Sequence, residues 1–181
     1  TFVLTAVENA PDWTGEISLV SQAEIEGEVI TREVRPYSRC WNIAGFNSSR
    51  PTRELGLAVR EKGPFALVLD PAEVTVEAGK SVDVTVRARR LWDGFDGRIS
   101  IIPSALPGGF SMGNSEVAAS ADDGKVTFQV QAGRLPGKYT MTVLGQAQVP
   151  FSKDATAENR PNTLVTLPAT SVTLNVTEPA K

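Results

Sequence analysis

The segment "GRLPGKYTMTV", residues 133–143, combines a turn with the start of a strand. Pro136 and Gly137 are residues that favour tight turns. The residues after them alternate between apolar and hydroxyl side chains, which is the pattern of a half-buried β-strand. Tyr139 stands at the head of this strand, so we expect its ring in the core and its hydroxyl bonded to a main-chain group upstream, beside a packed Leu135. The alternative is an ordinary half-buried strand tyrosine.

The rest of the second half repeats this two-residue periodicity in short segments rich in Val, Ile and Thr. Proline cannot donate a ladder hydrogen bond, so the first of these segments, 65–79, is expected to break at Pro71. Asp123 and Gly124 are expected to form a tight hairpin turn. The alternation predicts that the core is lined by Val82, Val84, Val86, Ala88, Ile99, Ile101, Val126, Phe128, Val130, Met141, Val143, Val172, Leu174 and Val176.

These segments predict the fold class. About seven short strands separated by turn residues, without a sustained helical period, indicate an all-β protein. Strands at this spacing form an immunoglobulin-like sandwich, and a tyrosine at the corner before the sixth strand is typical of that fold. We therefore expect an immunoglobulin-like antiparallel β-sandwich over 64–181, preceded by a smaller β-rich segment, 1–63, with the boundary at Lys62-Gly63-Pro64.

The first segment is less regular than the second. Residues 1–10 and 29–36 can be aligned with the last strands of the second half, which predicts an incomplete immunoglobulin-like module plus a connection. Residues 38–53 are rich in Gly, Ser, Asn and Pro and are expected to form a loop. The stretch 53–61 alternates again, and its predicted inward residues are Leu55, Leu57 and Val59.

The composition excludes several classes of function. The 181 residues are 41% hydrophobic and 22% charged, with a formal charge of −3, and Lys and Arg are spread along the chain, so nucleic-acid binding is not indicated. No apolar run approaches the roughly 18 residues of a membrane helix. Histidine is absent, which removes the commonest general base and metal ligand, and the single Cys40 cannot form an intrachain disulfide. We expect no cofactor and no membrane insertion.

The stretch "RRLWDGFDGR", residues 89–98, is the candidate site for ligand contact. In a functional interpretation, Trp92 and Phe95 stack on a sugar beside Asp93 and Asp96, or the carboxylates form a weak calcium loop. The spacing does not match a D-x-D-x-D-G calcium motif. In the structural interpretation, which we favour, the stretch is a loop in which Phe95 plugs the core and Gly94 and Gly97 supply positive φ angles.

Trp13 and Trp41 raise the same choice between a carbohydrate-binding surface and packing in a core or an interdomain seam, and packing is favoured. Acid/base pairs can be drawn from carboxylates alone, as in glycosidases, with Asp93 and Asp96 or the alternating glutamates of 24–28. The sequence places none of these groups in a pocket, so a hydrolase is the weakest hypothesis.

The whole pattern resembles the immunoglobulin-like repeats of large secreted bacterial proteins, which often also carry pre-peptidase C-terminal domains. It is similar, too, to the immunoglobulin-like module associated with alpha-galactosidases. The segments that carry the resemblance are "PAEVTVEAGKSVDVTV" (71–86), "GFDGRI" (94–99), "LPGG" (106–109), "PGKYT" (136–140) and the tail at 145–176. The resemblance implies a non-catalytic module in a multi-domain protein of the extracellular space or cell envelope, and such families have no catalytic motif.

Three functions remain open at this point. The first is a structural spacer or interaction module whose partners are neighbouring domains of the same polypeptide. The second is an accessory module that binds a polysaccharide or a cell-surface protein through its aromatic residues. The third is the carboxylate-only hydrolase.

Overall fold

The computed structural model describes residues 3–7, 9–34, 37–43, 46–51, 54–154 and 156–179, with the backbone alone for 37–43 and 46–51. The chain divides into two compact units, one of Ala6–Glu61 and one of Thr1–Thr5 with Lys62–Lys181. The larger unit is the antiparallel β-sandwich that the sequence predicts. No described residue lies in a helix, so none forms the long apolar helix that crossing a membrane would require.

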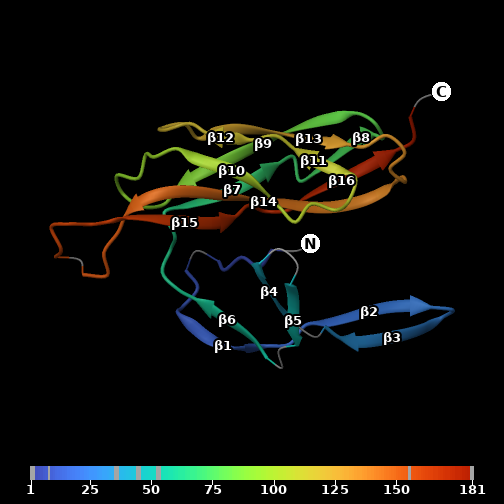
Figure 1. The fold of residues 1–181 in the computed structure, drawn as a ribbon, viewed down its shortest axis with the longest axis horizontal. Coiled ribbons are helices and arrows are strands. Elements are labelled where there is room, and N and C mark those ends of the chain that lie inside the picture. The colour runs from blue at the N-terminus through green and yellow to red at the C-terminus, as the bar shows by residue number, and fades with distance from the viewer. Residues whose placement is uncertain are drawn as a thin grey trace. The chain divides into compact units, whose positions relative to one another are not determined.

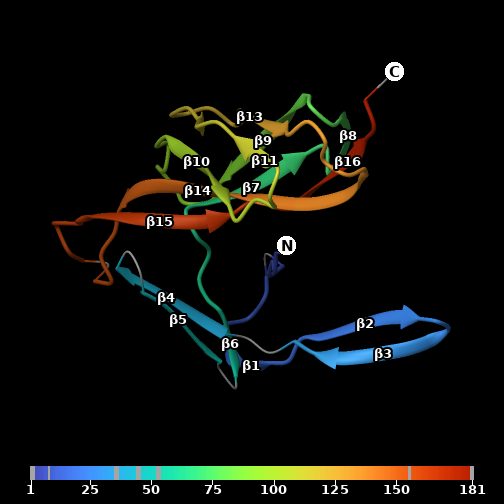
Figure 2. The same ribbon diagram turned by 45° about the vertical axis from the view of Figure 1, so that its right-hand side comes forward.

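Two sheets face each other in the larger unit (Figures 1 and 2). The first sheet has the order β11-β13-β9-β7 and the second β12-β10-β14-β16-β8, with β15 also paired to β14. All these pairs are antiparallel except β16 with β8. The strands are β7 (Phe65–Asp70), β8 (Glu73–Glu77), β9 (Ser81–Arg90), β10 (Ile99–Ser104), β11 (Phe110–Met112), β12 (Ser115–Val117), β13 (Asp123–Val130), β14 (Gly137–Pro150), β15 (Asn162–Pro168) and β16 (Val172–Thr177).

The predicted break at Pro71 is confirmed, and it has a structural consequence. β7 ends at Asp70 and pairs with β9, whereas β8 begins at Glu73 and pairs with β16 in the opposite sheet. Proline interrupts the ladder because it has no N–H to donate. The first strand of the sandwich is thereby divided between the two sheets.

The core lies between the sheets, and the predicted inward faces are confirmed. The alternating apolar residues of β9, β10, β13, β14 and β16 are buried, except Val82, which is half-buried against the core. The opposite face of β9 carries Asp83, Thr85, Arg87 and Arg89 at exposed or half-buried positions. A slip of one residue would bury these polar side chains, so the register is strongly determined.

The hairpin turn expected at Asp123-Gly124 is wrong. Both residues lie in β13, paired with Arg87 and Val86, and the turn comes earlier, where the Ala121 N–H donates to the Ala118 carbonyl at 3.1 Å. Glycine is required at 124 for a different reason. A Cβ there would lie 2.5 Å from the Glu116 carbonyl oxygen, so the absence of a side chain allows β12 to pass close to β13.

The tyrosine corner is present at the start of β14. The Tyr139 hydroxyl donates to the Leu135 carbonyl at 2.8 Å, which confirms the predicted main-chain hydrogen bond. Gly137 has a φ of 151°, which favours glycine. The ring is half-buried rather than buried, and the expectation that Leu135 packs is wrong, because its side chain is 74% exposed. The Arg134 guanidinium covers the ring instead, 4.3 Å from its centroid.

Replacing Tyr139 with phenylalanine is expected to lower the free energy of unfolding by about 1 kcal/mol, because the ring stays while the hydrogen bond to Leu135 is lost. The measurement is a urea titration in which amide NMR peaks report the larger unit separately from the smaller one. Leu135→Ala is the matched control, since it keeps the carbonyl acceptor and removes an exposed side chain. An unchanged midpoint in Tyr139→Phe would show that the hydroxyl contributes nothing.

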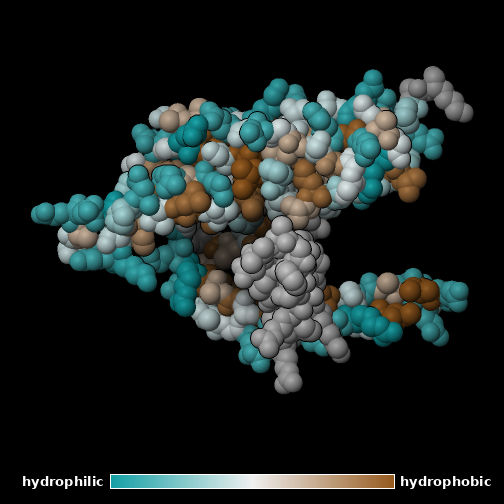
Figure 3. Space-filling view, viewed as in Figure 1, coloured by the Kyte–Doolittle hydropathy of each residue, from teal (hydrophilic) through white to brown (hydrophobic). Residues whose placement is uncertain are grey.

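The described residues of the smaller unit form three two-stranded antiparallel sheets. The strands are β1 (Trp13–Ile17) with β6 (Leu55–Val59), β2 (Val20–Ile25) with β3 (Glu28–Glu33), and β4 (Tyr37–Ile43) with β5 (Phe46–Pro51). Leu55, Leu57 and Val59 are half-buried on one face of β6, as their alternation predicts. Val20, Ile25 and Val29 are exposed on the β2–β3 hairpin, where Figure 3 shows hydrophobic patches.

Two expectations for the segment 1–63 are wrong. The described residues within 1–10 form no strand, and Leu4 and Val7 are exposed. Residues 38–53 were expected to form a loop, but β4 and β5 pair there as a hairpin. A composition rich in loop-forming residues indicates only the local conformational preference of the chain, and cross-strand pairing can override that preference. That this unit is part of an incomplete immunoglobulin-like module stays a prediction.

Candidate functional site

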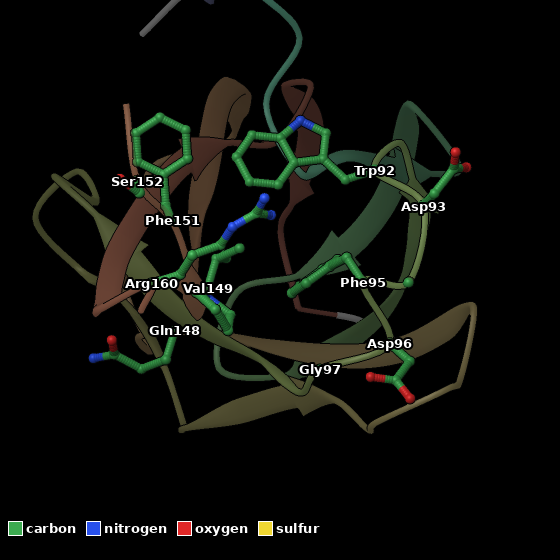
Figure 4. A pocket seen from close by; sticks show the side chains of 12 residues that line it. Trp92, Asp93, Phe95, Asp96, Gly97, Gln148, Val149, Phe151, Ser152 and Arg160 are labelled. Atoms are coloured by element: carbon green, nitrogen blue, oxygen red, sulfur yellow. The ribbon is translucent and has the colours of Figure 1, made fainter. Parts of the chain in front are cut away.

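A pocket of about 550 Å³ lies at one end of the sandwich (Figure 4). One wall is the segment 92–97, which follows β9, and the other is the segment 148–152 at the end of β14, together with Arg160. Pockets of this size are typical of small-ligand sites. The candidate residues that the sequence singled out, Trp92, Asp93, Phe95 and Asp96, therefore lie together around one cavity.

Arg90, the last residue of β9, holds the first wall in place. Its guanidinium donates to the carbonyls of Gly97 at 2.8 Å, Ala121 at 3.0 Å and Ala118 at 3.1 Å. It also lies 5.2 Å from the centre of the Phe95 ring, within the range of a cation–π contact. Three carbonyl acceptors and one aromatic face bind this cation, so it supports the loop rather than offering its charge to the pocket.

Phe95 fills the end of the core, as the structural interpretation predicts. Its side chain is only 9% exposed and stacks on Phe65 with 5.9 Å between the ring centroids. It contributes to the floor of the pocket rather than to its rim. Gly94 has the expected positive φ of 75°, whereas Gly97 does not. A Cβ at Gly97 would lie 3.2 Å from the Phe95 ring, so close packing is the reason for that glycine.

Trp92 is the aromatic residue that remains accessible. Its indole Nε1–H donates to the Lys62 carbonyl at 2.7 Å, and its ring is half-buried. The Phe151 ring lies 5.8 Å away between centroids, at an angle of 30°, and Phe151 is 38% exposed. Sequence analysis did not identify Phe151, because it follows β14 far along the chain and only the fold brings it to Trp92. The signal that could have found it is an apolar residue just beyond the strand end.

The carboxylates do not form a pair directed at one point. Asp93 and Asp96 are exposed at the rim, and Figure 4 shows them pointing in different directions, neither toward the two rings. Across the part of the chain that the structure describes, no three His, Cys, Asp or Glu side chains cluster as metal ligands.

Three carboxyl groups elsewhere have a pKa below the ordinary value. The Asn175 side chain and then Lys138 lower the pKa of Glu73. Hydrogen bonds from Thr127 and then Lys125 lower the pKa of Asp83, and the Thr156 side chain and backbone lower that of Asp154. Each shift favours the ionised form, which suits a surface hydrogen bond rather than proton donation.

The remaining candidates lie in the smaller unit. Trp13 is in β1 and 43% exposed, and its indole covers Gly15, where a Cβ would lie 2.5 Å from Cζ2 of the indole. Trp13 thus packs along its own strand. Cys40 and Trp41 lie in β4, and their side chains are outside the described part of the structure.

No protein-family model matches the chain, and no curated protein matches it. Among solved structures, the chain is similar to one described under "Structural basis of T cell specificity and activation by the bacterial superantigen toxic shock syndrome toxin-1". The match covers 62% of this chain and 99% of that chain, with 12% identity and a TM-score of 0.34. The residues of this chain are therefore the basis for assigning a function.

Proposed function

We propose that this chain is a non-catalytic structural and interaction module that orders neighbouring domains of an exported bacterial multi-domain protein. The immunoglobulin-like sandwich of the larger unit and the resemblance of its sequence to repeats of secreted proteins support the proposal. The location outside the cytoplasm follows from that resemblance, and immunodetection of the parent protein in fractionated cells checks it.

The attachment of residues 62–64 to the sandwich is the observation that carries the proposal. The ladder between β7 and β9 continues beyond its last pair, because the Leu91 N–H donates to the Pro64 carbonyl at 2.8 Å. Two residues earlier, the Lys62 carbonyl accepts from the Trp92 indole at 2.7 Å. Residues 62–64 are thus held on the sandwich at two points, whereas a free linker would sample many directions.

The test compares the tumbling of the two units by ¹⁵N relaxation in the wild type and in Trp92→Phe. This variant keeps an aromatic ring but removes the donor to Lys62. We expect similar rotational correlation times for both units in the wild type and clearly different ones in the variant. Phe151→Leu is the control, since it leaves the indole hydrogen bond intact. Independent tumbling of the two wild-type units would contradict the spacer function.

A further inference from the structure

The two accessible rings of the pocket, those of Trp92 and Phe151, contact each other as an offset pair rather than fully face to face. Carbon atoms in contact are about 3.5–4.0 Å apart, so a centroid separation of 5.8 Å at 30° describes an offset stack, in which the rings overlap only in part and most of each ring stays uncovered by the other. Figure 4 shows the rings of Trp92 and Phe151 side by side, with both faces turned the same way. Together they form a stepped apolar surface of two rings, inclined to each other by 30°, which we call the Trp92–Phe151 platform.

The indole of Trp92 and the backbone of Phe151 are held in place before any ligand arrives. The Trp92 indole is oriented by its hydrogen bond to the Lys62 carbonyl. The backbone of Phe151 is fixed because its N–H donates to the Pro161 carbonyl at 3.1 Å, which closes the base of the β14–β15 connection. A rigid platform loses little conformational entropy on binding, so contact area converts efficiently into affinity.

Polar groups surround the platform. Asp93 and Asp96 line the pocket on the side of Trp92, and Gln148 and Arg160 line it on the side of Phe151. Carboxylates only accept hydrogen bonds, a guanidinium only donates them, and an amide does both. A ligand that fits this rim needs a flat apolar face for the rings and edge groups that both donate and accept.

We propose that the Trp92–Phe151 platform binds a neutral polysaccharide, with consecutive sugar rings lying on the two aromatic rings. A pyranose presents a face of C–H groups, and its equatorial hydroxyls donate and accept hydrogen bonds at the edge. A proline-rich peptide also stacks on aromatic rings, but its prolines have no N–H to donate to the acceptor groups that line the pocket. The two carboxylates also disfavour a polyanion.

The full ¹⁵N-labelled chain is titrated with soluble β-linked oligosaccharides of glucose, mannose, xylose and N-acetylglucosamine, and in parallel with a proline-rich peptide. At least one oligosaccharide is expected to shift the Trp92 indole N–H and the Val149 amide. Phe151→Ala should weaken that binding about tenfold or more, as loss of a central aromatic contact does. Leu135→Ala, exposed at the other end of β14, should leave affinity unchanged.

The binding experiment can fail while the spacer function holds, and the reverse is also true. Phe151→Ala should weaken binding while it leaves the Trp92–Lys62 hydrogen bond, and therefore the tumbling of the two units, as in the wild type. The proposal is overturned if no oligosaccharide shifts these resonances, if Phe151→Ala binds as tightly as the wild type, or if only the proline-rich peptide binds. Two-dimensional NMR spectra of each variant show whether it remains folded.

Discussion

Phe128→Ala is expected to lower the free energy of unfolding of the larger unit by about 3–5 kcal/mol, the largest effect of any single truncation considered for this protein. Phe128 lies in β13, between Met112 of β11 and Val82 of β9, and its side chain is fully buried. Its removal loses the apolar transfer free energy of the ring and leaves a cavity that the two sheets cannot close by small movements.

The measurement for Phe128→Ala is the urea midpoint of the larger unit at constant slope, followed by its amide NMR peaks. Val68→Ala is the matched control, because Val68 lies on the edge strand β7 and is 38% exposed. Its midpoint should move far less. If Phe128→Ala unfolds at the same urea concentration as the wild type, the inward face of β13 has been assigned incorrectly.

The second large effect is expected at Gly145 in β14, which packs against side chains of β7 in the opposite sheet. Gly145 is buried in β14, and a Cβ there would overlap the Leu67 side chain and lie 3.0 Å from both Ile99 and Phe65. Gly145→Ala therefore forces the facing strands apart or their side chains out of preferred rotamers. We expect a loss of about 1–3 kcal/mol in the free energy of unfolding, as overpacked cores show.

Gly108→Ala is the control for Gly145→Ala. A Cβ at Gly108 meets no atom within 4 Å, and its φ is not in the left-handed region. The same urea titration should show no loss of stability for Gly108→Ala and a clear loss for Gly145→Ala. Equal midpoints for the two variants would mean that the sheets separate at Gly145 without cost.

Only one of the two walls of the candidate site could be predicted from the sequence. Trp92, Asp93, Phe95 and Asp96 are neighbours in the chain, so their shared place in a loop could be predicted from local pattern. Phe151 could not be assigned to the same site, because its proximity to Trp92 depends on β14 extending to Pro150 at the end of the sandwich where β9 ends. The division of roles between the buried Phe95 and the accessible Trp92 also required the packing of Phe65.

The amino-acid order was enough to assign the inward faces of β9, β10, β13, β14 and β16, the break at Pro71 and the Tyr139 hydrogen bond, because alternation and turn chemistry are properties of neighbouring residues. Which strands pair with each other could be assigned only from the assembled fold. That is why Asp123-Gly124 proved to be strand, and why 38–53 proved to hold a paired hairpin. Hydrogen-bond partners and close approaches such as Gly124 against Glu116 join segments distant in sequence, and local propensity carries no information about them.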